Sequence, residues 1–318
     1  MQLTCVGVES QTADVSRFTF LADRPLAFIP GQFLSLQVPI EDRTSVRAYS
    51  ISSIPSDARV QLTIKRVEGG RVSNFLLDNL KMGQSLQALP PAGEFNSELA
   101  GDQPWLLLGA GCGVTPLFSM LRDRLQRQPD ADICLLFSVR GEADKIFASE
   151  LEHLAKHHRN FRLHWLLSGE GVRLDSDNLA RFVPDVAQRS VMICGPESYM
   201  VTAKQLASEQ GALRVHCEAF HAPVHSEEAA GGGHTLSVDG VELPILPGQT
   251  VLESLEAGGI PIFAACRAGV CGSCKCQGEK SKIRSSSTLG LTEAEIDQGI
   301  FLACSSTVTA DMTVELND

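Results

Sequence analysis

The sequence CRAGVCGSCKC, residues 266–276, places four cysteines within eleven positions. Three of them, Cys266, Cys271 and Cys274, have the spacing C-x4-C-x2-C, which is typical of a [2Fe–2S] cluster that takes one more distant cysteine. Cys304, in FLACSS, follows after 29 intervening residues. Two irons bridged by two sulfides need four thiolates, so a tight loop supplies three and a separate segment supplies the fourth. We therefore predict that Cys266, Cys271, Cys274 and Cys304 are the metal ligands.

Two other uses of these thiols compete with a cluster. A structural zinc site favours paired CxxC or CxxC/HxxH units, but Cys304 has no cysteine or histidine near it in the sequence. A thioredoxin-type CxxC would follow a strand and open a helix, and it would leave Cys266 unexplained. Cys276 is the surplus thiol. We interpret it as a bystander, because the chain is already leaving the cluster at that point.

The flanks of the cysteine loop predict a small β-grasp domain over residues 234–318. HTLSVDGVELPIL contains two short strands around Asp239-Gly240, a dipeptide that suits a type I′ hairpin turn. QTVLESLEAGG predicts a helix with a capping box of Thr250 and Glu253, and Gly258 ends it. Residues 223–233, rich in Gly, Ala and Glu, have the composition of a flexible linker.

Residues 1–99 alternate apolar and polar side chains in short runs, which predicts an antiparallel β-barrel. Within it, RAYSISSIP (47–55) offers Arg47 to a phosphate, Tyr49 to a flat ring and Ser50 to a ring edge. Alone, this stretch is more typical of an exposed strand than of a cofactor site. GGRVSNFLLDNL (69–80) places glycines before a helix, which makes a phosphate cradle of backbone N–H groups with Ser73 near the cap. The two elements together favour a cofactor site.

Residues 100–222 change to buried strands followed by helical patterns, as in ICLLFSVR and VMICGPESYM, which predicts a doubly wound α/β domain. PWLLLGAGCGVTPLFSMLRDRL runs from a strand through a Gly-rich turn into a helix expected to begin near Pro116. Its glycines are Gly109, Gly111 and Gly113, and Val114 stands where G-x-G-x-x-G has its last glycine. By itself, the turn is also compatible with an ordinary strand–helix connection.

Charge and composition narrow the class of protein. The chain of 318 residues has a net charge of −11, which argues against nucleic acid as a partner because a polyanion would be repelled. The start, MQLTCVGVESQTADV, has neither the basic nor the apolar region of a signal peptide. No uncharged apolar run is long enough to cross a bilayer. Ten cysteines in such a chain predict a cytoplasmic protein, where clustered thiols more often bind metal than form disulfides.

The motifs R-x-Y-S, GxGCGVTP, CGP and the cysteine spacing occur in this order. Together they resemble the ferredoxin–NADP reductase superfamily with a C-terminal plant-type ferredoxin, and the resemblance covers essentially the whole chain. RAYSISS, AACRAGVCGSCK and SSTLGLTEAEIDQGIFLACS are most similar to NADH-dependent reductases of hybrid-cluster proteins. Reductases of the phthalate dioxygenase type share the domain order and are the nearest alternative. One departure is the polar, basic segment KCQGEKSKIRSSS, where relatives usually have an apolar-alternating strand.

The resemblance implies FAD, rather than FMN, on the barrel, a pyridine nucleotide on the α/β domain and a [2Fe–2S] cluster on the last domain. The implied flavin contacts are Arg47, Tyr49, Ser50 and Lys65, with Gly70, Arg71, Val72 and Ser73 on the phosphate. The implied nucleotide contacts are Gly111, Thr115, Cys194, Gly195 and Pro196. Cys194, Thr115 and Ser50 are implied to be catalytic, although Cys194 is also compatible with a small buried hydrophobe. Glu218 and Phe220, in CEAFHAP, are implied to end the reductase module near the flavin.

These cofactors imply an order of electron flow. NADH gives a hydride, two electrons at once, and the cluster accepts one electron at a time. A flavin does both, so it must stand between them. The resemblance implies a redox partner protein, a hybrid-cluster protein, with the terminal component of an oxygenase as the alternative. A non-catalytic iron–sulfur or thiol redox sensor on a reductase scaffold is a hypothesis of another class.

Two further predictions come from charge. After the strand ICLLFS, Arg140 favours the 2′-phosphate of NADPH, whereas Glu142 and Asp144 favour the 2′-hydroxyl of NADH, and the resemblance favours NADH. In residues 234–318 the basic residues all lie between 267 and 284, and ten of the eleven acids lie outside that stretch. This predicts a basic rim around the cluster that steers an acidic partner, with a solvated loop as the alternative. The rim residues are Arg267, Lys275, Lys280, Lys282 and Arg284.

Overall fold

The computed structural model describes residues 1–41, 43–220, 233–264, 267, 269, 272–288 and 291–316. The predicted linker therefore lies outside the described residues, except for Gly233. The chain divides into two compact units, one of residues 1–45 and 49–218 and one of residues 46–48 with the chain from 219 onward. None of the described helices is long and apolar enough to cross a membrane.

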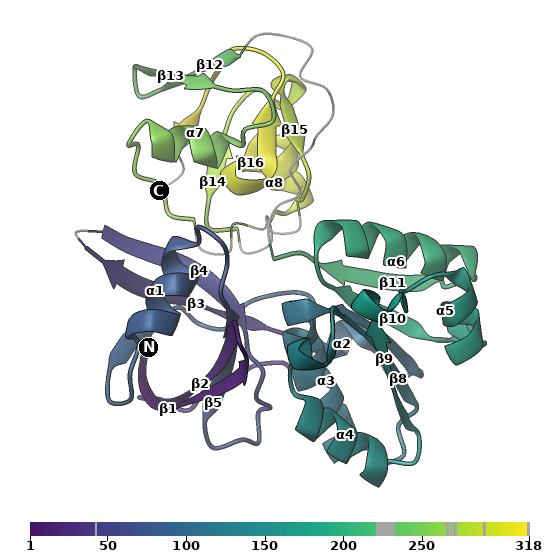
Figure 1. The fold of residues 1–318 in the computed structure, drawn as a ribbon. Helices are drawn as coiled ribbons and strands as arrows, with labels where there is room; N and C mark the ends of the chain where they lie inside the picture. The colour runs from purple at the N-terminus through teal and green to yellow at the C-terminus, as the bar shows by residue number, and fades with distance from the viewer. Residues whose placement is uncertain are drawn as a thin grey trace. The chain divides into compact units, whose positions relative to one another are not determined.

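The N-terminal part of the first unit is the predicted barrel (Figure 1). Its six strands lie in the order β4-β3-β6-β1-β2-β5, and alternating side chains such as Phe18 and Phe20 fill the interior. An antiparallel bridge between Ile51, directly after β4, and Leu62 of β5 closes the sheet. The strands are β1 (Gln2–Thr12), β2 (Val15–Ala22), β3 (Phe33–Ile40), β4 (Arg43–Ser50), β5 (Val60–Lys65) and β6 (Ser85–Ala88). Helix α1 (Arg71–Asn79) buries Val72 and Leu76 against this core.

The α/β domain is a five-stranded parallel sheet in the order β11-β10-β7-β8-β9. Alternate residues of β7 face opposite layers. Trp105 and Leu107 join the core with α3 and α4, whereas Leu106 and Leu108 join the core with α5 and α6. The predicted doubly wound fold is thereby confirmed. The elements are β7 (Trp105–Ala110), α3 (Val114–Arg127), β8 (Ile133–Val139), α4 (Ala148–His157), β9 (Phe161–Leu167), α5 (Ser176–Phe182), β10 (Ser190–Cys194), α6 (Glu197–Glu209) and β11 (Arg214–Glu218).

The described C-terminal residues form small sheets around α7 (Val251–Ala257), whose apolar side is buried. Asp239 and Gly240 both have positive φ, 49° and 79°, so they form the predicted hairpin turn between β12 (His234–Val238) and β13 (Val241–Ile245). The capping box of Thr250 and Glu253 is also present, as predicted. The remaining elements are β14 (Lys275–Gln277), β15 (Ile283–Ser285), α8 (Glu293–Asp297), β16 (Ile300–Leu302), β17 (Ser306–Val308), β18 (Met312–Thr313) and β19 (Glu315–Leu316).

Candidate cofactor sites

The end of β4 carries the predicted flavin contacts. Successive side chains of a strand point to opposite faces, so Arg47 and Tyr49 share one face and Ser50 lies on the other. Arg47 is half-buried and its Nη1 donates to the carbonyl oxygen of Val46 at 2.7 Å. Tyr49 packs against the barrel core and Ser50 is buried. A cation and an aromatic ring on one face fit a flavin phosphate and ring, and the contact of Ser50 with a ring edge stays a prediction.

The start of α1 has the form of a phosphate cradle. Gly70 directly precedes the helix, no side chain caps its first N–H groups, and its first turn contains no acidic residue. An uncapped N-terminus of this kind favours an anion. A Cβ at Gly70 would lie 2.7 Å from Oγ of Ser73 and 2.9 Å from Cβ of Val67, so a larger residue there would require these neighbours to shift. Val72 turns inward to the core. Gly70, Arg71, Val72 and Ser73 are thus brought together, and their backbone suits the flavin phosphate.

Two predicted cations beside this cradle already have acidic neighbours. Arg71 donates from Nη2 to the carbonyl oxygen of Ile40 and to Oε2 of Glu41, both at 3.2 Å. Lys65 ends β5, and its Nζ lies 3.3 Å from Oδ2 of Asp14. The structure therefore does not place Lys65 in the cradle, and its contact with the flavin stays a prediction.

The Gly-rich turn and CGP meet where the α/β sheet reverses its strand order. From β7 the chain continues to β8 on one side, whereas β10 pairs with β7 on the other. In such sheets, ligands bind outside the carboxyl ends of the strands at this switch point. Gly111 opens a 3-10 turn there at a φ of 52°, with open space around it. Pro196 stands directly before α6 on the neighbouring strand's end.

The two turns touch through their backbones. A Cβ at Gly113 would collide with the carbonyl group of Cys194. A Cβ at Gly195 would lie 2.9 Å from Cδ1 of Tyr199 and 3.0 Å from Cβ of Ala110. The helix α3 begins at Val114, two residues earlier than expected, because the glycines already form the 3-10 turn that leads into it. Gly113 and Gly195 therefore serve close packing between the turns, whereas Gly111 has open space around it.

Thr115 stabilises the Gly-rich turn of residues 109–113, here named the nucleotide turn after the nucleotide contacts that were predicted for it. Its buried hydroxyl donates to the carbonyl oxygen of Cys112 at 2.9 Å. This bond gives Thr115 a structural role, and a direct catalytic role stays a prediction.

Cys112 itself was missed by the sequence analysis. Its thiol donates to the carbonyl oxygen of Thr63 in β5 at 3.7 Å, and burial raises its pKa to about 12. The sequence signal that could have identified Cys112 is its position between Gly111 and Gly113 in the turn from strand to helix.

Cys194 lies fully buried at the end of β10. Burial raises the pKa of its thiol far above the usual range, and the negative charge of Glu218 adds to this effect. Glu218 is its register partner at the end of β11 and is itself buried. A neutral thiol of this kind can pack against a ring but is a poor nucleophile. Phe220 is partly exposed. The flavin contacts of Glu218 and Phe220 stay predictions.

Two predicted cluster ligands come together in the C-terminal unit. The pairing of β14 with β16 brings Cys274 and Cys304 side by side, and the backbone N–H of Cys304 lies 3.5 Å from Sγ of Cys274. The N–H of Gly269 donates to Sγ of Cys304 at 3.2 Å, while the hydroxyl of Ser287 donates to the carbonyl oxygen of Gly269 at 2.7 Å. Backbone N–H groups aimed at cysteine sulfurs are the environment that an iron–sulfur cluster uses. The residues present therefore fit the cluster.

Of the other three cysteines of the loop, only Cys276 lies among the described residues. Cys266 and Cys271 lie outside the described residues, so their ligand roles stay predictions. Cys276 stands in the middle of β14 opposite Phe301, fully buried in the core of the unit. Burial raises the pKa of its thiol to about 12. This placement supports its interpretation as a bystander.

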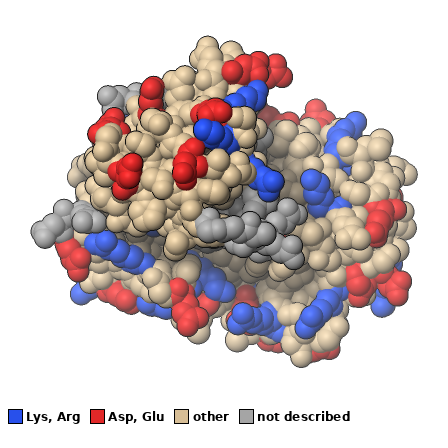
Figure 2. Space-filling view, turned by 90° about the horizontal axis from the view of Figure 1, so that it is seen from above, with Lys and Arg blue, Asp and Glu red and all other residues tan. Residues whose placement is uncertain are grey.

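The charges that are separated along the sequence are not separated in the fold. Four of the five predicted rim residues form ion pairs with acids of the same unit, and only Arg284 among the described rim residues has no such pair. Figure 2 shows the same mixture, because positive and negative side chains lie next to one another on the face in view. The predicted basic rim is therefore wrong as a continuous surface. The pairs are Arg267–Glu256, Lys275–Glu295, Lys280–Asp297 and Lys282–Glu279.

Known proteins share this order of sites. Residues 2–97, 107–205 and 235–309 match the oxidoreductase FAD-binding domain, the oxidoreductase NAD-binding domain and the 2Fe-2S iron-sulfur cluster binding domain. NADH oxidoreductase HCR of Escherichia coli is 35% identical over 314 residues, which cover 96% of this chain and 95% of that one. The glycine betaine monooxygenase reductase subunit of Pseudomonas aeruginosa is 34% identical over 344 residues, which cover 98% and 94%.

The fold has a solved counterpart as well. Phthalate dioxygenase reductase, described as a modular structure for electron transfer from pyridine nucleotides to [2Fe–2S], superimposes with a TM-score of 0.71 at 23% identity. The match covers 99% of this chain and 98% of that one. The chain therefore belongs to the family of flavin- and iron–sulfur-dependent NADH oxidoreductases, in the domain order of phthalate dioxygenase reductase. It is an electron-transfer reductase, and FAD and a [2Fe–2S] cluster would supply the route by which electrons leave NADH.

Proposed function

We propose that the electron acceptor of this reductase is a hybrid-cluster protein. One observation carries this proposal, namely the alignment with the Escherichia coli NADH oxidoreductase HCR over 314 residues, nearly the full length of both chains. The alignment with the glycine betaine monooxygenase reductase subunit extends over 344 positions, more than the 318 residues of this chain. That subunit therefore has insertions relative to this chain. The motifs around the cysteine loop favour the same assignment.

The second candidate is a reductase of a monooxygenase or another oxygenase. The relative from Pseudomonas aeruginosa, at almost the same identity, favours it. A third hypothesis, a non-catalytic redox sensor, has no support from these relatives, which are named reductases and oxidoreductases. The cytoplasmic location expected from the sequence, and the domain boundaries at residues 99, 222 and 234, stay predictions.

Each proposed contact has a task in this function. Arg47, Tyr49 and the start of α1 bind and orient the flavin, and Gly111 with the CGP turn brings the nicotinamide to it. Cys194 packs beside the two rings and excludes water from the space between them. Cys274 and Cys304, with Cys266 and Cys271, hold the cluster through which electrons leave.

The test is to give the purified full chain NADH and compare candidate acceptors. A hybrid-cluster protein should be reduced with a kcat/KM at least about tenfold above that for an oxygenase component, which corresponds to about 1.4 kcal/mol of discrimination. The Cys304→Ala variant is the control, because it should still reduce a dye through the flavin but neither protein acceptor. Faster reduction of the oxygenase component would overturn the proposed partner. Failure of the wild-type chain to reduce any dye with NADH would revive the sensor hypothesis.

A further inference from the structure

One face of α3 is polar although the helix lies inside the first unit. Thr115, Ser119, Arg122 and Gln126 follow one another at intervals of four, three and four residues, so they lie along one side of the helix. Thr115 holds the nucleotide turn, as described above. The other three contact residues of the segment 52–57, which follows shortly after β4, the strand that carries the predicted flavin contacts.

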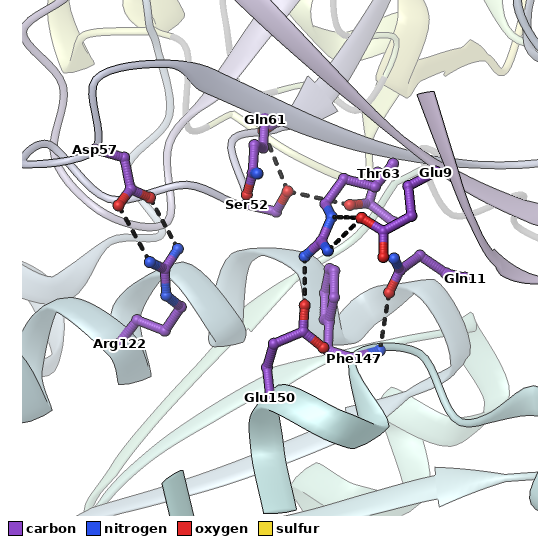
Figure 3. Close-up of polar contacts among 10 residues, drawn as sticks. Glu9, Gln11, Ser52, Asp57, Gln61, Thr63, Arg122, Phe147 and Glu150 are labelled. Atoms are coloured by element: carbon purple, nitrogen blue, oxygen red, sulfur yellow. Dashed lines mark hydrogen bonds and ion pairs between the residues drawn. The ribbon is translucent and has the colours of Figure 1, made fainter. Parts of the chain in front are cut away.

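These contacts are specific in their geometry. The hydroxyl of Ser119 donates to the carbonyl oxygen of Ser53 at 2.6 Å, and both residues are fully buried. The guanidinium of Arg122 forms a fork with the carboxylate of Asp57 at 2.9 and 3.1 Å, as Figure 3 shows. A two-bond fork fixes orientation as well as distance.

A third contact lies one turn further along. The hydroxyl of Ser56 donates to Oε1 of Gln126 at 2.9 Å. The helix that begins in the nucleotide turn is therefore bound to the segment after β4 at three successive levels.

The same segment is anchored to the barrel on its other side. The hydroxyls of Ser52 and Thr63 lie 3.1 Å apart, as Figure 3 shows. The N–H of Gln61 donates to Oγ of Ser53 at 3.0 Å. Cys112, in the nucleotide turn, reaches the carbonyl oxygen of Thr63 as well. A continuous path of bonds thus runs from the flavin strand through residues 52–57 to α3 and back to the nucleotide turn.

We propose that Ser119 and Arg122 are positioning residues for hydride transfer. They set where the nucleotide turn stands relative to the flavin strand, although neither belongs to a predicted cofactor contact. Hydride transfer is sensitive to such placement, because a displacement of about 1 Å costs up to about 100-fold in rate. The inference rests on the proposed flavin and nucleotide contacts and not on the identity of the electron acceptor.

A second link between barrel and α/β domain supplies a matched control. Arg17 of β2 pairs with Glu150 of α4 at 2.6 Å and with Glu9 of β1 at 2.6 Å. This ion pair joins the same two parts and makes no hydrogen bond to α3 or to the segment 52–57, although Arg17 also lies over the ring of Phe147, which stacks on Phe118 of α3. Loss of the Glu150 carboxylate should therefore loosen the contact between the two parts without moving the nucleotide turn.

The experiment compares Ser119→Ala, Arg122→Met and the control Glu150→Gln in the full chain. The limiting rate of flavin reduction at saturating NADH should fall about tenfold or more in the first two variants, with bound FAD and the Kd of NADH within about twofold of the wild type. Glu150→Gln should keep that limiting rate within about twofold. Amide hydrogen exchange should become faster at residues 112–115 in Arg122→Met and stay unchanged there in Glu150→Gln.

Two rescue variants separate positioning from general stability. Ser119→Thr keeps the hydroxyl and should recover most of the limiting rate. The double variant Asp57→Arg with Arg122→Asp restores an ion pair in reverse but loses the bond from the N–H of Ile54 to Asp57, so it should recover part of that rate. Arg122 and Asp57 are each about a quarter exposed, at 26% and 29%, so these variants should fold. The proposal is overturned if Ser119→Ala and Arg122→Met slow flavin reduction no more than Glu150→Gln does, or if they change only the Kd of NADH. These readouts do not involve the partner protein, so a wrong acceptor assignment would leave their outcome unchanged.

Discussion

Gly113 lies so close to Cys194 that a single methyl group at Gly113 would overlap the carbonyl group of Cys194. The two residues come from different strand ends, β7 and β10, which pair in register from Ser190 with Trp105 to Cys194 with Gly109. The contact therefore joins the Gly-rich turn to the CGP turn at the switch point of the sheet. Both turns carry proposed nucleotide contacts, so their spacing governs how the nicotinamide is held.

The first prediction concerns this contact. Gly113→Ala should destabilise the protein by about 1–3 kcal/mol, because the obstructing atoms are backbone and the turns must separate. It should also slow flavin reduction by NADH. Gly171→Ala is the control, since Gly171 has a φ of 84° but open space around it, and backbone strain alone should cost about 1 kcal/mol. Denaturant unfolding and anaerobic flavin reduction measure both effects. Equal stability and equal rates for the two variants would contradict the role of the contact.

The second prediction is a preference for NADH over NADPH in kcat/KM. Glu142 and Asp144 stand after β8, where an acidic group bonds the ribose 2′-hydroxyl and repels a 2′-phosphate. Asp144 accepts from the N–H of Gly141 at 3.1 Å, and Glu142 pairs with Lys145, whereas Arg140 is exposed. Glu142→Gln should therefore raise kcat/KM for NADPH more than for NADH. A higher kcat/KM with NADPH in the wild type would refute the assignment.

The third prediction concerns a buried cation at the amino-terminal ends of the parallel strands, opposite the predicted nucleotide site. The guanidinium of Arg189, 1% exposed, forms two-bond contacts with both Asp132 and Asp185 and donates to the carbonyl oxygen of Trp105. Arg189→Met should cost about 3 kcal/mol, the lower end for a buried pair, because the carboxylates keep a third or more of their exposure. Arg162→Gln, which removes a more exposed partner of Asp132, should cost less than about 1 kcal/mol.

The pH dependence of this network gives a second readout. Hydrogen bonds from Arg189 hold the pKa of Asp185 below its usual 3.8. Burial would raise the pKa of Asp132, but separate hydrogen bonds from Arg189 and the charges of Arg189 and Arg162 outweigh it and lower that pKa. A lowered folded pKa stabilises the protein above the unfolded value, and the stabilisation is lost as the pH falls through the folded value. The stability gap between wild type and Arg189→Met should thus stay constant above about pH 5 and shrink below about pH 4. Tryptophan fluorescence can follow the unfolding of both proteins at each pH, since both tryptophans lie in the α/β domain. A gap independent of pH would argue against the network.

Local chemistry made much of this architecture predictable. Asp239-Gly240 fixed a hairpin because both residues take positive φ, and Thr250 with Glu253 fixed a helix start because the two groups cap each other. The doubly wound domain followed from buried strands alternating with helices. Cys274 and Cys304 could be paired because a cluster needs a thiolate from a second segment, and the pairing of β14 with β16 supplies it.

Long-range contacts were not predictable in the same way. The side chains of Ser119 and Arg122 look like an ordinary polar helix face, and only the fold brings them to Ser53 and Asp57. The basic rim failed for the same reason. In the sequence, Lys280 is 17 positions away from Asp297, yet the fold places its Nζ 2.9 Å from Oδ1 of that residue. Charge patterns along a chain therefore indicate composition but not surface potential.

The fourth prediction separates the cluster ligands from the surplus thiol. Cys304→Ala should lose iron, acid-labile sulfide and the iron–sulfur absorbance, because it removes one of four thiolates. Cys276→Ala should keep all three, since Cys276 lies in the core of β14, although the small cavity should cost about 1 kcal/mol of stability. Iron and sulfide analysis of both purified variants measures this. A cluster that survives Cys304→Ala and is lost in Cys276→Ala would reverse the assignment.

Electrons pass from NADH through the flavin to the cluster within this one chain. Anaerobic stopped-flow absorbance with NADH tests it most directly, because the flavin and iron–sulfur bands can be followed separately in the same protein. We predict that the flavin band bleaches first and the iron–sulfur band follows at a rate independent of protein concentration, whereas Cys304→Ala shows only the flavin phase. Iron–sulfur bleaching that precedes the flavin phase, or that never occurs in the wild type while the flavin is reduced, would contradict the account.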